Sequence, residues 1–392
     1  MKEELKKSLN QALKSLEKEH NVILSKTRIE IKENKEKEFG DFSSNLALVL
    51  SKELSKPPKD IAEMLLKELG EKDFIDRMEI AGPGFINFFL SHASRTEILK
   101  IINKEKNKFG FSTRKKAEKD SVLIEYVSSN PTGPLHVGHG RGAAFGSVLA
   151  SILKATGHQV DEEYYVNDQG RQTEILSLSV WLRYLEIFNQ VSLFPNNCYQ
   201  GAYIESLAKE LEKDKDNKFC VDKELEKEIS QFLSLDLTEE ELDNLIAKSK
   251  ELLKKGFKEI TTFALENILQ NIERDLKAFG VEHNKWFKES SMFRGSKTSV
   301  SLVGEALDSL ESKKRVYEKD GALWFKSTDF GDEKDRVVKR ENGATTYFAS
   351  DIAYHANKFD RGYSKIINVW GADHHGYLPR VGAAMSALGE DT

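Results

Sequence analysis

The stretch from 121 to 166 constrains the fold more than any other part of the chain. It begins with the short apolar run 122–127, passes through a turn rich in proline and glycine, and enters an alanine-rich helical pattern at 137–157. A second apolar run, 158–166, follows the helix. Strand, turn, helix and strand in this order are typical of a parallel sheet covered by helices. The sequence therefore predicts a doubly wound, Rossmann-like α/β domain.

The turn inside this stretch carries two histidines and several glycines. His136 and His139 are three residues apart where the helix begins, and Gly138 lies between them. The first N–H groups of a helix lack intrahelical acceptors and the helix dipole makes that end positive, so such a turn can bind phosphate. Two imidazoles on one face of the first helical turn can donate to the same polyphosphate. The simplest alternative is that the histidines only cap the helix.

Two other kinds of site compete with a nucleotide triphosphate site. Histidines at this spacing can bind zinc, but no third ligand lies nearby on the same helix, so we expect no metal site. Residues 138–143 also satisfy the loose dinucleotide fingerprint G-x-G-x-x-A, and acidic residues follow about twenty positions later, at 161–163. In that fingerprint the glycine turn follows the strand directly, whereas here residues 128–135 lie between the strand and the glycines. A dinucleotide-dependent dehydrogenase is therefore kept as an alternative function.

The whole string resembles the HIGH signature of class I aminoacyl-tRNA synthetases, which reads HVGH at 136–139. Its surroundings resemble the arginyl-tRNA synthetase family, with EYVSSNP at 125–131, YVNDQGRQ at 165–172 and YFASD at 347–351. The resemblance implies an arginine-tRNA ligase, which activates L-arginine with ATP, accompanied by Mg²⁺, to arginyl-adenylate and transfers it to arginine tRNA in translation. The alternative within this resemblance is a synthetase-like protein that binds nucleotide or tRNA without activity.

The resemblance also implies roles for single residues. His136 and His139 would be catalytic, because they would stabilise the negative charge that develops on the phosphates. ATP would be bound by His136, Gly138, His139, Gly371 and Asp373. Arginine would be bound by Glu125, Asn130, His136, Tyr347, Asp351 and His374, with Asp351 as the partner of the planar guanidinium. Read without the family, Ser350 or Asp351 is most simply the N-cap of a helix that begins there.

Length and composition agree with a multi-domain protein of the cytoplasm. The chain has 392 residues, which suggests two or three domains, and its two cysteines are too few for a disulfide framework. No run approaches the roughly twenty apolar residues of a membrane span. The net charge of -5 argues against indiscriminate nucleic-acid binding, while 59 Lys and Arg residues allow a local basic surface for tRNA. We expect a cytoplasmic monomer.

The predicted domain boundaries follow from these patterns. Residues 1–109 read as a small α+β domain, with leucines at helical spacing in its first helix and a β-rich run around a Gly-Pro-Gly turn at 82–84. The resemblance implies that this domain contacts the outer corner of tRNA. Residues 118–392 would be the catalytic domain, with a charged helical insertion at about 177–320 and a second sheet half that begins at 321–325. No KMSKS-type loop or anticodon-binding domain occurs, so we expect a fragment that is weak or inactive alone.

Overall fold

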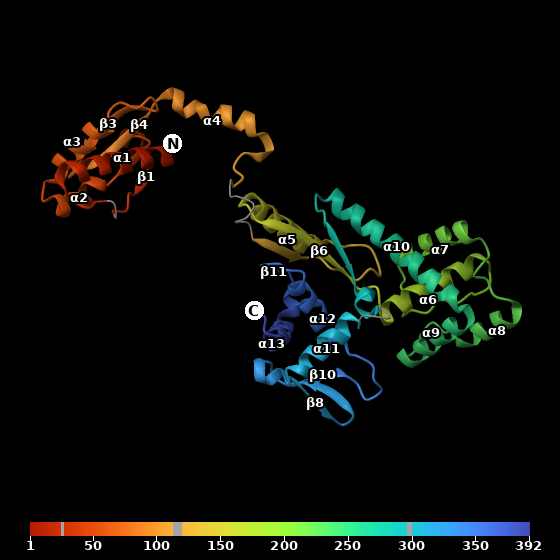
Figure 1. Cartoon of the computed structure of the whole chain (residues 1–392). Helices are drawn as coiled ribbons and strands as arrows, with labels where there is room; N and C mark the ends of the chain where they lie inside the picture. Colours follow the sequence, from red (N-terminus) through yellow and green to blue (C-terminus); the bar gives the residue numbers. More distant parts are fainter. Residues whose placement is uncertain (25–26, 113–119, 296–299) are drawn as a thin grey trace. The chain divides into compact units, whose positions relative to one another are not determined.

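The computed structural model describes residues 1–24, 27–112, 120–295 and 300–392, without the side chains of 372–374. The chain divides into two compact units, Met1–Gly110 and Phe111–Thr392, and each is described by itself (Figure 1).

The first unit is an antiparallel sheet packed on helices. Its strands have the order β1-β2-β4-β3, with bounds β1 Ile31–Glu33, β2 Phe42–Ser44, β3 Ile75–Ala81 and β4 Phe85–Leu90. Its helices are α1 Lys2–His20, α2 Leu46–Leu54, α3 Pro58–Leu69 and α4 His92–Glu105. The leucines of α1 are buried against this sheet and its helices. The small α+β domain predicted from the sequence is confirmed.

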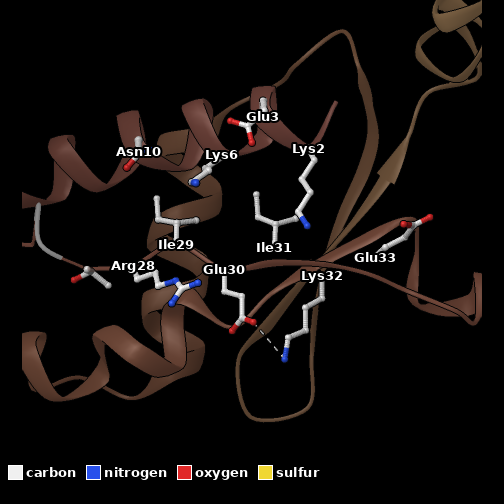
Figure 2. Close-up of a pocket in the computed structure, with 11 residues that line it drawn as sticks. Lys2, Glu3, Lys6, Asn10, Arg28, Ile29, Glu30, Ile31, Lys32 and Glu33 are labelled. Carbon is white, nitrogen blue, oxygen red and sulfur yellow. Dashed lines mark ion pairs between the residues drawn. The ribbon is translucent and has the colours of Figure 1, made fainter. Parts of the chain in front are cut away.

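A groove of about 760 Å³ lies between α1 and the β1 segment of this unit. Figure 2 shows Lys2, Lys6 and Arg28 beside it, together with Glu30 and Lys32. The Glu30 carboxylate lies 3.6 Å from the Lys32 ammonium. Because acidic and basic side chains alternate around the groove, its charge is mixed rather than strongly positive.

The centre of the second unit is a parallel sheet with the strand order β11-β5-β6-β7. Its strands are β5 Ser121–Glu125, β6 Gln159–Val166, β7 Lys285–Lys288 and β11 Lys365–Asn368. From β5 the chain winds outward to β6 and β7, whereas β11 pairs with the opposite edge of β5. The direction of winding therefore reverses between β5 and β11, which is where ligands of such sheets bind.

Helices cover both faces of this sheet. Side chains of a strand alternate between the faces, and Val122, Ile124 and Tyr126 pack in one core with residues of α5, Val137–Ala155. Glu125 points the other way and meets Lys358 of α12, Tyr347–Asp360. Helices α5 and α12 can be followed beside the sheet in Figure 1. The predicted doubly wound fold is confirmed.

A helical block lies between β6 and β7 in the sequence. Its helices are α6 Arg171–Ile187, α7 Ala202–Lys215, α8 Lys223–Phe232, α9 Glu239–Leu253 and α10 Lys255–Ala278. Helix α6 is buried on most sides because the other helices of the block pack around it. The sequence predicted an insertion at about 177–320, whereas β7 already returns to the sheet within that range. Four residues in a charged stretch are too few for a strand pattern to stand out.

A separate antiparallel sheet follows β7. Its strands, in the order β10-β9-β8, are β8 Val316–Lys319, β9 Ala322–Phe325 and β10 Arg336–Lys339. The prediction that 321–325 opens the second half of the main sheet is wrong. Asp320 and Gly321 both have positive φ, at 51° and 72°, and this turn folds β9 back on β8 as a hairpin. Helices α11 (Leu302–Ser312), α12 and α13 (Leu378–Leu388) complete the unit.

Candidate active site

A cavity of about 1040 Å³ opens where the winding of the parallel sheet reverses. It is lined by the turn after β5, the first turns of α5 and the segment 369–371 after β11. The cavity brings together His136, Gly138, His139 and Gly371, which were predicted to bind ATP. The side chain of Asp373, the fifth predicted residue, lies outside the described part of the structure.

The two histidines cap α5. His136 is the N-cap, and its Nδ1 accepts from the backbone N–H of Gly138 at 3.1 Å. The backbone N–H of His136 donates to Nδ1 of His139 at 3.2 Å. Because both Nδ1 atoms accept, each neutral ring carries its proton on Nε2 and can donate from there. Burial, with a smaller contribution from neighbouring His136, lowers the pKa of His139 and favours this neutral form.

Glycine at position 138 leaves room for the ring that caps the helix. A Cβ at Gly138 would lie 2.8 Å from Cε1 of His136, so a larger residue would displace the capping ring. The glycines 138–142 lie within α5 and not in a turn that leaves the strand directly. The acidic residues after the helix have partners inside the fold, since Tyr363 donates to Asp161 and Arg361 pairs with Glu163. These positions do not support the dehydrogenase alternative.

The turn between β5 and the histidines is strained. Val127 and Ser128 have φ values of 69° and 43°, in the left-handed region that a β-branched residue such as valine rarely adopts. Each such residue costs about 1–3 kcal/mol and persists only when its surroundings hold it. The Ser128 hydroxyl donates to Oε1 of Glu125 at 2.9 Å and accepts from the N–H of Tyr165 at 3.0 Å. These contacts fix the wall of the cavity.

Glu125, which was predicted to bind arginine, is buried at the end of β5. Burial alone would raise the pKa of its carboxyl group, but the ammonium of Lys358 and its hydrogen bond outweigh burial, so the pKa is lowered. The carboxylate is therefore ionised and already has partners on both oxygens, Lys358 and Ser128.

A second cavity, of about 300 Å³, contains two more of the predicted residues, Asn130 and Tyr347. Asn130 and Thr132 line both cavities, so a ligand in one would lie next to a ligand in the other. The Asn130 amide donates to Oε1 of Gln172 at 2.9 Å. Tyr347 is the first residue of α12 and 66% exposed, so its hydroxyl is accessible to a ligand.

Asp351 lies in the second turn of α12. The prediction that Ser350 or Asp351 caps this helix is wrong, because the N-cap is Thr346, whose carbonyl already accepts from the N–H of Ser350 at 3.4 Å. The Asp351 carboxylate accepts from the hydroxyl of Tyr377. The side chain of His374, also predicted to bind arginine, lies outside the described part of the structure.

A further carboxyl group, that of Glu289, is buried close to Asp351. Glu289 follows β7 in a short 3₁₀ helix, Glu289–Phe293. Burial raises its pKa to about 7, and the negative charges of Asp351 and Asp168 add to this effect. The hydroxyl of Tyr165 is hydrogen-bonded to Glu289. A buried carboxyl group whose pKa is raised by neighbouring carboxylates attracts a cation.

Two family descriptions cover most of the chain. The "Arginyl tRNA synthetase N terminal domain" matches residues 3–90, and "tRNA synthetases class I (R), catalytic domain" matches residues 97–389. The chain belongs to the class I arginyl-tRNA synthetase family.

Individual relatives agree with this family. The arginine--tRNA ligase of Acinetobacter baumannii (strain AYE) is 47% identical over 374 residues, which are 91% of this chain and 61% of the relative. That of Legionella pneumophila (strain Paris) is 45% identical over 393 residues, 98% of this chain and 64% of the relative. The chain thus spans less than two thirds of the length of these relatives.

Solved structures show the same relationship. The putative arginyl-tRNA synthetase of Campylobacter jejuni has a TM-score of 0.59 and 37% identity, over 76% of this chain and 57% of that one. The arginyl-tRNA synthetase of Thermus thermophilus has a TM-score of 0.51 and 22% identity, over 99% of this chain and 63% of that one, which supports the fold alone.

In this arginyl-tRNA synthetase chain, Glu289 is a candidate site residue that sequence reasoning missed. Polar residues at the carboxyl ends of parallel strands are the usual signal of a ligand site, and Glu289 directly follows β7. The signal was hidden because β7 itself was not predicted. Among the residues that the structure describes, no group of three or more His, Cys, Asp or Glu side chains is placed to hold a metal ion, and no helix is long and apolar enough to cross a membrane.

Proposed function

We propose that this chain is the part of an arginine-tRNA ligase that activates L-arginine with ATP, and that the arginyl-adenylate so formed supplies arginine tRNA in translation. The observation that carries the proposal is the pair of adjoining cavities. One contains His136 and His139 at the start of α5, and the other contains Tyr347, with Asn130 and Thr132 shared between them. A nucleotide and an amino acid can therefore lie side by side.

The chemistry requires positioning and charge stabilisation rather than a nucleophile from the protein. The carboxylate of arginine attacks the α-phosphorus of ATP, and pyrophosphate leaves with the electrons of the broken P–O bond. The Nε2–H groups of His136 and His139 would donate to phosphate oxygens as negative charge develops on them. The loss of one such donor typically costs about 3 kcal/mol in the transition state. Gly371 and Asp373 would complete the adenosine side.

The carboxylates of Asp351 and Glu289 would select the guanidinium of arginine. Asp351 and Glu289 are close enough to raise the pKa of Glu289, and a guanidinium can offer paired hydrogen bonds to such carboxylates where lysine offers a single ammonium. Tyr347 would contact the same end of the substrate. Asn130 would lie near the α-amino group of arginine, and the buried negative charge of Glu125 would attract that group. His374 would complete the site.

Magnesium would enter as the metal complex of ATP. The lining of the cavity that holds the two histidines includes no carboxylate among the described residues, so these residues offer no ligand set for Mg²⁺ there. No step of the mechanism above depends on a metal held by the protein.

Residues 1–109 would contact the outer corner of arginine tRNA, and residues 118–392 would form the catalytic domain. The protein would act as a monomer in the cytoplasm. These assignments are supported by membership of the arginyl-tRNA synthetase family.

Calorimetric titration of the chain with arginine and with lysine tests the proposal. We expect arginine to bind and lysine to bind at least tenfold more weakly. Lysine would leave buried polar groups of the site without hydrogen-bond partners, which typically costs about 1–3 kcal/mol. Asp351→Asn keeps an acceptor for Tyr377 but removes the charge, and should lower arginine affinity about tenfold by the same measure. Equal affinity for the two amino acids, or an unchanged Asp351→Asn variant, would contradict the assignment.

A further inference from the structure

Lys358 is a fully buried lysine at the point where the two ligand-binding strand ends meet. It lies in the last turn of α12, and its side chain has no solvent exposure. A buried ammonium is costly unless it is paired and hydrogen-bonded. Its Nζ donates to Oε2 of Glu125 and, at 2.6 Å, to Oδ1 of Asn368, and it lies 4.2 Å from the ring centroid of Tyr354.

The two hydrogen-bond partners of Lys358 are the last residues of neighbouring strands. Glu125 ends β5 and Asn368 ends β11, so one ammonium joins the strands on either side of the reversal in winding. A backbone hydrogen bond at the same place, from Val369 to the carbonyl of Glu125 at 2.8 Å, ties the strand ends further. Beyond these residues the chain leaves the sheet and lines the ATP cavity from both sides.

On the β5 side, Lys358 acts on the strained turn. It holds Oε2 of Glu125 and leaves Oε1 to accept from Ser128, whose backbone is in the left-handed region. Without the ammonium, the buried Glu125 carboxylate would lose its charge partner and would turn toward water or take up a proton. The Ser128 contact, and with it the wall of the cavity before His136, would then lose its support.

On the β11 side, the network continues to Asp351, the proposed partner of the guanidinium. The amide of Asn368 lies 3.2 Å from Nε2 of His355, and Nδ1 of His355 lies 2.8 Å from the carbonyl oxygen of Asp351. With Asn368 donating to Nε2, the proton of His355 is on Nδ1 and is donated to Asp351. The helix turn that carries Asp351 is therefore connected to the same ammonium that fixes the ATP cavity.

We propose that Lys358 is a positioning residue, which holds the ends of β5 and β11 in the geometry that ATP and arginine both require. The inference rests on the proposed function and adds a residue that touches neither substrate. Side chains that orient such groups typically change ligand affinity or activity about 10–100-fold when removed, as known for metal sites.

The experiment compares Lys358→Met with Arg361→Met in the whole chain. Arg361 is the matched control because it is the C-cap of α12, three residues after Lys358, and also pairs with a buried carboxylate. That carboxylate, Glu163, lies 3.0 Å from Arg361 in the same sheet but away from both cavities. Both variants should lower the melting temperature. Calorimetry should show ATP and arginine affinities about tenfold lower for Lys358→Met, and within twofold of the unaltered chain for Arg361→Met.

Affinities that are equally unchanged, or equally lowered, in the two variants would overturn the positioning role. If Lys358→Met does not fold, the double variant Lys358→Met, Glu125→Gln removes both charges and takes its place, with the same expected loss and the same contradicting result. Absence of ATP and arginine binding by the unaltered chain would instead refute the proposed function, and would be seen before any variant is measured.

Discussion

The imidazole rings of His136 and His139 stack with their centroids 3.8 Å apart, and each ring uses Nδ1 to accept a backbone hydrogen bond. The pair therefore closes the open end of α5 and leaves two Nε2–H donors for a ligand. Helix capping and phosphate binding depend on different nitrogen atoms, so the two roles can be separated by substitution.

Two substitutions of His136 should separate the roles. His136→Ala removes cap and donor, and should lower the free energy of unfolding by about 1 kcal/mol. His136→Asn retains an acceptor suited to the N-cap, so its stability should stay close to that of the unaltered chain. Both should bind ATP about tenfold more weakly, because a hydrogen bond to a charged group is lost. Urea unfolding and calorimetry measure the two effects, and normal ATP binding by His136→Asn would exclude the donor role.

Arginine binding should strengthen as the pH rises through neutrality. The pKa of Glu289 is about 7 because of burial and then of Asp351 and Asp168. A guanidinium favours the ionised carboxylate, so binding lowers this pKa and releases a proton below about pH 7. Between pH 6 and pH 8 the affinity should rise about tenfold, as one linked proton requires.

Titrations in buffers of different ionisation enthalpy would count the released proton. Glu289→Gln is the control, since it keeps the shape of the side chain and removes the titrating group. Its arginine affinity should be lower and nearly independent of pH in this range. A pH dependence that survives in Glu289→Gln would assign the effect to another group.

A buried ion pair should stabilise the segment before β10. Arg336 donates to both carboxylate oxygens of Asp332 at 2.8 Å and, with burial opposing it, lowers the pKa of Asp332 from 3.8 to about 2. A lowered pKa stabilises the fold above the unfolded value, and this contribution is lost as the pH falls from about 4 toward 2.

Asp332→Asn should therefore lower the free energy of unfolding by about 2 kcal/mol at pH 7. The difference between the variant and the unaltered chain should shrink at pH 3, where much of the contribution is already lost. Asp329→Asn, at an exposed carboxylate of the same segment, should change the stability little at either pH. Urea unfolding at both pH values measures these differences.

The parts of the fold that were predicted from sequence are those with long, regular patterns. β5, α5 and β6 were predicted within two residues of their ends because two apolar runs flank an alanine-rich helical pattern and a turn rich in proline and glycine marks where the helix begins. β7 was missed because four residues cannot show a period. The start of α12 was misplaced because Ser350 and Asp351 are good capping residues, while the actual N-cap, Thr346, makes no side-chain capping bond.

The site was predictable only where a local string carried it. His136 and His139 lie within one turn, so spacing alone indicated a shared ligand. The approach of Glu289 to Asp351 depends on how β7 and α12 meet in three dimensions, and Lys358 reads in the sequence as an ordinary helical lysine. Its partners are 233 residues away at Glu125 and 10 away at Asn368, and no local pattern links such positions.

Substitution of glycine by alanine in α5 should destabilise the packing of this helix on the sheet at one position and not at another. A Cβ at Gly146 would lie 2.2 Å from Cγ of Tyr126, whereas a Cβ at Gly142 would meet nothing within 4 Å. Gly146→Ala must push α5 away from β5, and overpacking of this kind typically costs about 1–3 kcal/mol. Gly142→Ala occupies the same helix without a clash and should stabilise the fold by about 0.5 kcal/mol, since alanine loses less backbone entropy than glycine. Thermal unfolding of the two variants should therefore shift in opposite directions, and a Gly146→Ala variant as stable as Gly142→Ala would show that the close contact between α5 and Tyr126 is absent.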